Sequence, residues 1–168
     1  FETAYRLHKA GLVQLVSPEE LLEQAEEKLV NGNIQYGLGL LAKACEGLEG
    51  KPELQVEAGQ LYMWAGRDEE ARKVLDEALH HLLEAGQLEV ALKFLESLHQ
   101  QYPDRTYPLE RLVRIYREVP DFESAHRFAT DLLTLYHDRG DHERIHKLLT
   151  FLNDFPVKDE HSRLSLAR

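Results

Sequence analysis

The chain has 168 residues, of which 43% are hydrophobic, so it is long and apolar enough to bury a core as one domain or as a short array of repeats. Thirty acidic against twenty basic residues give a net charge of −10, and the excess lies in residues 1–86, which hold 16 acidic and 8 basic residues against 14 and 12 in residues 87–168. Because nucleic acids and anionic membranes are bound through Lys and Arg, this charge argues against direct contact with either.

Residues 1–16 are predicted to be a leading segment. Residues 5–16, YRLHKAGLVQLV, are typical of a helix end, a break at Ala10-Gly11 and a short extended apolar run. Two interpretations stay open: a frayed helix that caps the repeats, or the tail of a truncated upstream domain, since this order of elements resembles the close of a winged-helix domain. The chain begins at Phe1 without a methionine, so we expect a fragment of a longer protein.

Helical hairpins are predicted from residue 17 onward. Ser17 can cap a helix that begins at Pro18, and the acidic residues after it suit the positive end of the helix dipole; we expect this helix to reach Val30. A second helix is expected from Ile34 to about Leu48. The next hairpin should pair residues 52–65 with residues 68–85, so that Pro52 begins it as Pro18 begins the first hairpin.

The turns recur with an alternating spacing. They fall at positions 32, 66, 86, 120 and 140, so a long interval alternates with a short one. The helices at 68–85 and 121–139 should therefore be continuous, longer than their neighbours and shared by two hairpins. Residues 102–108 are predicted to be the longest connection and a flexible joint. Residues 157–168 are expected to form either a capping helix or a frayed end.

Small residues and larger apolar ones recur at the steps by which antiparallel helices touch, with the clearest set at Gly59, Tyr62, Ala71, Leu75 and Ala78. This set resembles the tetratricopeptide repeat (TPR). The resemblance implies an all-α fold over residues 17–156: a right-handed superhelical array of antiparallel helical hairpins, a TPR-like α-solenoid of about nine helices. The family implies a non-catalytic protein–protein interaction module, a scaffold or adaptor inside a larger cytoplasmic protein, for example a signalling or regulatory one.

The chain also departs from this family. The glycine slot holds other residues in the remaining hairpins, and the lysines and asparagines of the family's two-carboxylate clamp have no match, since Leu22, Glu26, Val56 and Gln60 occupy those places. Two other roles stay open: a self-association or spacer domain, and a sensory arm of a transcription regulator. The sequence shows no apolar run long enough for a membrane span and no signal peptide, which favours the cytoplasm.

No motif indicates catalysis, a cofactor or a metal site. The string from His142 to His146 matches H-E-x-x-H, but no third ligand follows at a family spacing and the repeat register places Ile145 in the core. Cys45 is the single cysteine, so no intramolecular disulfide is expected, and it lacks a neighbouring base. Residues 37–40, GLGL, lie in a helical pattern where glycines are expected to allow close packing. We therefore expect a protein that is not an enzyme.

Three arginines at steps of three, Arg111, Arg114 and Arg117, are a candidate binding feature. The alternative interpretation is a solvated helix face on which they pair with Glu110 and Glu118. The arginine fork holds carboxylates, so we expect this surface to bind another protein or a peptide segment that carries acidic groups. On a repeat array the first helices of the hairpins line the concave face. That face would add Lys73, His80, Tyr107, Arg127 and His137, and the preceding hairpin would add Met63 and Trp64.

Overall fold

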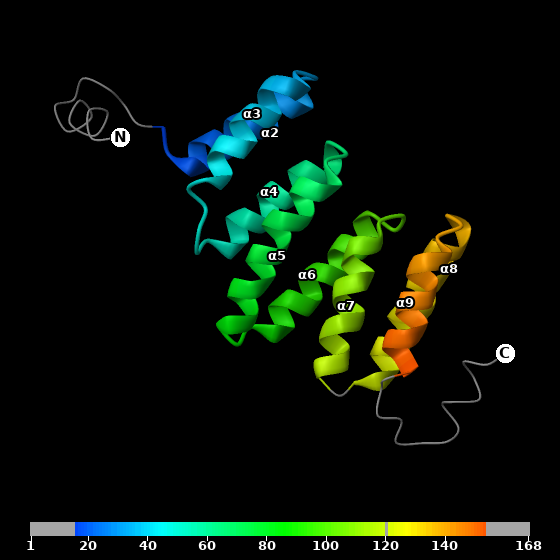
Figure 1. The fold of residues 1–168 in the computed structure, drawn as a ribbon. Helices are drawn as coiled ribbons and strands as arrows, with labels where there is room; N and C mark the ends of the chain where they lie inside the picture. Colours follow the sequence, from blue (N-terminus) through cyan, green and yellow to red (C-terminus); the bar gives the residue numbers. More distant parts are fainter. Residues whose placement is uncertain (1–15, 120, 154–168) are drawn as a thin grey trace. The chain divides into compact units, whose positions relative to one another are not determined.

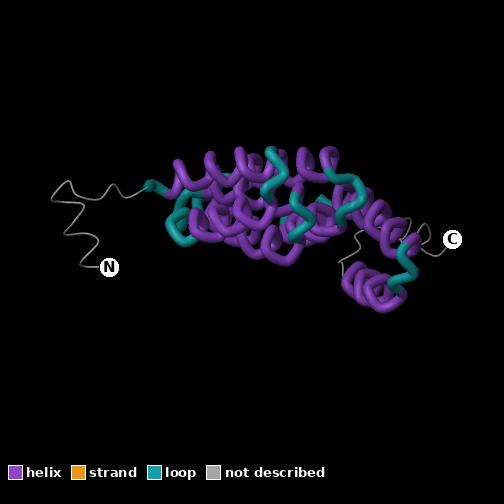
Figure 2. The backbone as a smooth tube through the Cα atoms, turned by 90° about the horizontal axis from the view of Figure 1, so that it is seen from above, coloured by secondary structure: helices purple, strands orange, loops and turns teal. Residues whose placement is uncertain are grey.

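The computed structural model describes residues 16–119 and 121–153 and is all-helical over them, with short connections (Figures 1 and 2). The helices are α2 (Pro18–Val30), α3 (Ile34–Cys45), α4 (Pro52–Trp64), α5 (Asp68–Glu84), α6 (Leu88–Gln101), α7 (Thr106–Glu118), α8 (Phe122–Asp138) and α9 (His142–Asn153). The described residues thus hold eight helices, and the expected count of about nine is too high for them. Residues 157–168, and all of the leading segment except Val16, lie outside the described part of the chain.

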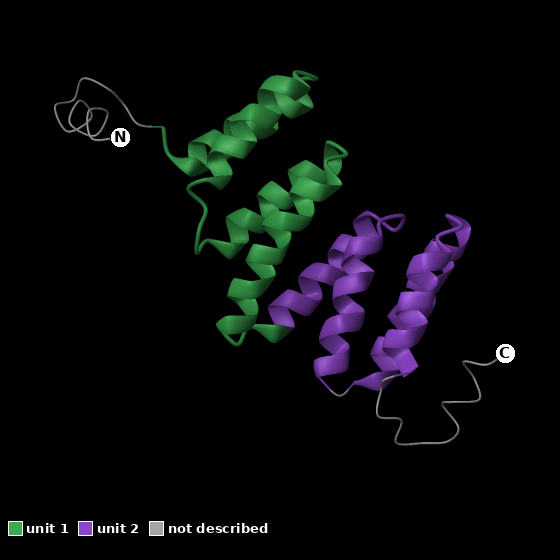
Figure 3. Ribbon diagram, in the orientation of Figure 1, with its two compact units in different colours: residues 1–88 green, residues 89–168 purple. Residues whose placement is uncertain are grey.

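The helices pack as consecutive antiparallel hairpins in two compact units, residues 1–88 and residues 89–168 (Figure 3). In unit 1, α2 packs on α3 and α4 packs on α5, and α4 also contacts α2 and α3. In unit 2, α7 packs on α8 and α8 on α9. No helix in the described ranges is both long and apolar enough to cross a membrane.

The predicted start of α2 is confirmed. The Ser17 hydroxyl accepts a hydrogen bond from the backbone N–H of Glu20 at 3.1 Å, and the Ser17 N–H donates to the Glu20 carboxylate at 3.1 Å. This reciprocal pair satisfies two backbone groups that a helix start leaves open, and Pro18 loses no needed donor at the first helical position. Local sequence alone therefore fixes where the first hairpin begins.

The glycine turns are confirmed where the structure describes them. Gly32, Gly66, Gly86 and Gly140 have φ between 66° and 80°, the left-handed region that glycine enters without a steric penalty. The turn predicted at Pro120 falls on a residue outside the described ranges. The spacing also predicts two long helices correctly: α5 and α8 are unbroken over 17 residues each, whereas the other six have 12 to 14.

In each of the two hairpins of unit 1, the paired helices approach each other closely at a glycine. A Cβ atom on Gly59 would lie 2.3 Å from Cδ2 of Leu75, and one on Gly37 would lie 2.8 Å from Cγ of Leu29, so both helix pairs need a residue without a side chain at the crossing. Ala71 and Ala78 on α5 are buried, as the repeat register predicts. A Cβ atom on Gly39 would meet nothing within 4 Å, so the expectation of close packing at this second glycine of GLGL is wrong.

Two boundaries differ from the prediction. α3 ends at Cys45, not near Leu48, because the next residues bond three positions back: the Gly47 N–H donates to the Ala44 carbonyl and the Leu48 N–H to the Cys45 carbonyl. Leu48 is nevertheless fully buried, which explains why its apolar spacing extends the helical pattern.

The predicted joint at residues 102–108 is also too long. α7 begins at Thr106 and takes Pro108 into its first turn, where the missing proline N–H has no helical partner to lose. The connection is therefore residues 102–105, which is shorter than the connection at residues 46–51 between α3 and α4.

Candidate functional site

The arginine row on α7 does not present three equivalent side chains to solvent. The Arg111 guanidinium lies 5.4 Å from the centroid of the Tyr107 ring, and the Arg117 guanidinium lies 4.2 Å from the centroid of Phe151 on α9. Both arginines are half-buried, whereas Arg114 is exposed. Tyr107 is only 7% exposed, so the expectation that it lies on an open binding face is wrong. The row serves in part to hold unit 2 together.

The other basic candidates lie on α5 of unit 1 (Lys73 and His80) and on α8 of unit 2 (Arg127 and His137). All four are exposed. His80 Nε2 lies 3.3 Å from Glu84 Oε1, and His137 Nδ1 lies 3.5 Å from Asp138 Oδ1, so these histidines pair along their own helices. Surface pairs of this kind contribute little free energy, and such contacts are typical of a solvated helix face.

The last two residues of α4 point in different directions. Met63 is 4% exposed and belongs to the core, so its prediction as a contact residue is wrong, because a buried thioether offers no surface. Trp64 is 53% exposed, and Val30, the last residue of α2, is 70% exposed. Both helices are 13 residues long and begin with proline, so the two exposed apolar side chains occupy the same position in consecutive hairpins.

Polar residues line the same face as these two side chains. On α2, Glu23 and Glu26 precede Val30 by seven and four positions; on α4, Glu57 and Gln60 precede Trp64 by the same steps. At 100° per residue, each set of three lies within about 60° on its helix. The buried residues Leu22, Ala25 and Leu29 lie one position earlier, about 100° away. We call this face the α2–α4 surface; its residues are Glu23, Glu26, Val30, Glu57, Gln60 and Trp64.

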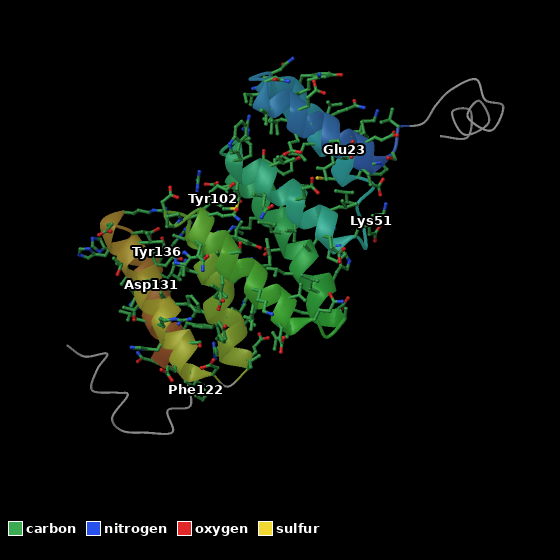
Figure 4. All side chains as sticks on the ribbon, turned by 180° about the vertical axis from the view of Figure 1, so that it is seen from behind. Glu23, Lys51, Tyr102, Phe122, Asp131 and Tyr136 are labelled. Carbon is green, nitrogen blue, oxygen red and sulfur yellow. The ribbon has the colours of Figure 1, made fainter. Side chains whose placement is uncertain are left out.

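The α2–α4 surface is acidic. α2 holds five acidic residues and α4 two, against the single basic residue Lys28. The pKa of Glu57 is raised, first by partial burial and then by the negative charges of Glu26 and Glu23, so carboxylates of both helices act on one another. Glu23 is labelled in Figure 4, which views unit 1 from the side of α2. The surface therefore combines two exposed apolar side chains with crowded negative charge.

The α2–α4 surface was not predicted from the sequence. The prediction placed Met63 and Trp64 on a binding face but left out Val30 and the three glutamates. The available signal was the repeat itself, because Glu57 follows Glu23, and Trp64 follows Val30, by the same interval that separates Pro18 from Pro52.

The H-E-x-x-H string lies at the start of α9 with both histidines exposed. Its glutamate pairs with Lys147, at 2.5 Å between Oε1 and Nζ. Ile145 is half-buried, so it is more exposed than the predicted core position implies. Among residues 16–119 and 121–153, no group of three or more His, Cys, Asp or Glu side chains is arranged to hold a metal ion. That the purified chain contains no stoichiometric metal stays a prediction.

Cys45 is half-buried beside Tyr62. Burial raises the pKa of the Cys45 thiol from 9.0 to about 11, and burial likewise raises the pKa of the Tyr62 hydroxyl. A thiol acts as a nucleophile only after it loses its proton, so the environment of Cys45 suppresses its reactivity.

We therefore expect Cys45 to react with a disulfide reagent at pH 8 at least about 10-fold more slowly in the folded chain than in urea. The rise in pKa from 9.0 to about 11 lowers the thiolate fraction about 100-fold, and the greater nucleophilicity of the more basic thiolate returns about 10-fold. The raised pKa also means that this residue favours folding below pH 9.0 and loses that contribution as the pH rises towards 11. Stopped-flow absorbance would follow the reaction. Equal rates in the folded and unfolded chain would contradict the assigned burial.

Comparisons with protein-family models, with curated proteins and with solved structures find no match to this chain. The function proposed for it therefore depends on its own residues.

Proposed function

We propose that this chain is a TPR-like helical repeat module that binds another protein through the α2–α4 surface, without catalysing a reaction, inside a larger cytoplasmic protein. The observation that carries the proposal is the exposure of Val30 and Trp64 at the same position of consecutive hairpins. One exposed apolar side chain is ordinary on any protein. Two at equivalent repeat positions form a regular feature, and tryptophan is enriched where proteins bind one another.

The repeat packing supports the TPR-like part of the proposal. Gly59 on α4 meets Leu75 on α5, and Gly37 on α3 meets Leu29 on α2, so each hairpin of unit 1 closes through one glycine and one leucine. Such hairpins are rigid supports on which outer residues can vary without loss of the fold. The exposed residues of α2 and α4 are therefore available for recognition.

Arg114 on α7 supports a second candidate surface, for a partner segment with acidic groups, because this residue is exposed. This surface is narrower than the sequence predicts, since Arg111 and Arg117 lie over aromatic rings of unit 2. We rank it below the α2–α4 surface because no exposed aromatic side chain accompanies Arg114 on α7.

Selection of peptides from a random phage-displayed library against the immobilised chain would test the proposal. We expect selected peptides to bind, and Trp64→Ala to weaken their binding at least about 10-fold, as truncation of an aromatic anchor that a partner covers on binding does. Leu83→Ala is the matched control, because Leu83 is an exposed apolar residue on α5 of the same unit and should leave affinity within about twofold.

Two outcomes would contradict the proposal. One is a library that yields no binder. The other is a mass in sedimentation equilibrium that rises with concentration and stays low in Trp64→Ala, which would favour the self-association or spacer role instead.

A further inference from the structure

The side chains around Val30 and Trp64 restrict what can cover them. Any partner that buries these two residues also approaches Glu23, Glu26 and Glu57, all of them exposed. A buried or half-buried carboxylate without a counter-charge is costly, so the partner must supply cations where it meets the glutamates. The apolar pair and the acidic residues thus act as one recognition feature.

We propose that the α2–α4 surface binds a basic amphipathic protein segment, whose Lys or Arg side chains pair with the glutamates while its apolar side chains cover Val30 and Trp64. This inference rests on the proposed function and specifies the chemistry of the partner. It also differs from the acidic partner that the sequence predicts, which would meet like charge on α2 and α4.

The crowding of carboxylates supports a cationic occupant. Glu57 already experiences the charges of Glu23 and Glu26, and its pKa is raised as a result of burial and this repulsion. A guanidinium or ammonium group placed among the three would relieve the repulsion, and arginine could hold one carboxylate bidentately. The affinity should therefore depend on ionic strength.

The same charges disfavour other occupants. A second copy of this chain on the same surface would bring two sets of three glutamates together, and like-charge contacts of this kind oppose a symmetric pairing. Nucleic acids and anionic lipids are disfavoured because α2 and α4 hold only one basic residue, Lys28.

The helix geometry sets the spacing of the partner's side chains. Val30 follows Glu23 by seven positions, and Trp64 follows Glu57 by seven, which corresponds to about 10 Å along each helix axis. A partner that runs along α2 and α4 should therefore carry its basic and apolar groups about 10 Å apart, or about three residues apart in an extended segment.

Trp64 offers a direct reporter, since the chain has one tryptophan. The probes are four synthetic peptides, each made of three copies of a four-residue unit: Arg-Arg-Ser-Leu, Gln-Gln-Ser-Leu, Glu-Glu-Ser-Leu and Arg-Arg-Ser-Ser. We expect the first to shift the Trp64 emission to shorter wavelength in a saturable way. The second and fourth should bind at least about 10-fold more weakly, and the third should cause no shift.

A pair of charge variants separates specific binding from general attraction. E23Q combined with E57Q should weaken the Arg-Arg-Ser-Leu peptide at least about 10-fold. E46Q combined with E49Q removes the same number of charges from exposed residues of the connection after α3 and should change affinity less than about twofold. If both double variants weaken binding equally, attraction is diffuse and the inference is overturned.

The display selection distinguishes this inference from the proposed function. Selected peptides that need Trp64 and carry an excess of Lys and Arg would support both. Selected peptides that need Trp64 but are neutral or acidic would support the module and overturn the basic partner. The absence of any binder that needs Trp64 would contradict both.

Discussion

Replacing Leu75 by Ala should lower the free energy of unfolding by about 2–5 kcal/mol. Replacing Gly59 by Ala in the same protein should recover part of that loss. Leu75 is fully buried. Its Cδ2 atom lies only 2.3 Å from the position that a Cβ atom of residue 59 would occupy, which is too close for both atoms to fit. G59A alone should therefore destabilise the chain by about 1–3 kcal/mol through overpacking, less what the better helix propensity of Ala returns. In the L75A background the added methyl group should instead stabilise, because the space is empty.

Denaturant unfolding of the four proteins in this cycle measures the coupling between the two positions. G39A is the control, since a Cβ on Gly39 meets nothing within 4 Å and Ala should raise stability by up to about 1 kcal/mol in both backgrounds. Equal effects of G59A with and without Leu75 would show that α4 and α5 do not cross at this point.

Replacing Phe128 by Ala should cost about 3–5 kcal/mol. Phe128 on α8 is 6% exposed, and its ring stacks on that of Tyr116 on α7, with centroids 5.6 Å apart and planes 15° apart. F128L keeps most of the volume and loses the ring contact, so it should cost less than about 1.5 kcal/mol. Thermal and denaturant unfolding of both variants would check the difference; an F128A protein as stable as F128L would contradict the packing of α7 on α8.

Local rules made the hairpins of this chain predictable. The serine and glutamate that cap α2 act within one helical turn, and the glycines after α2, α4, α5 and α8 are needed by the backbone itself, so their meaning does not depend on tertiary packing. The two long helices, α5 and α8, followed from the spacing of these turns.

Boundaries and exposure were harder to predict because they depend on neighbours. Leu48 is buried outside the helix, so apolar spacing misplaced the end of α3. Pro108 lies within the predicted connection, although the first helical turn tolerates proline. Tyr107 and Met63 lie on predicted outer faces but are covered by other side chains of the folded chain. A single helix pattern cannot show which of its edges another helix covers.

Binding of a partner to α2 and α4 is tested most directly by an amide chemical-shift map of the isotope-labelled 19.4 kDa chain with a display-selected peptide. We predict that the largest shifts fall in residues 23–30 and 57–64 and on the indole N–H of Trp64. Largest shifts on α7 to α9, centred on Arg114, with residues 23–30 and 57–64 unchanged, would contradict binding at the α2–α4 surface.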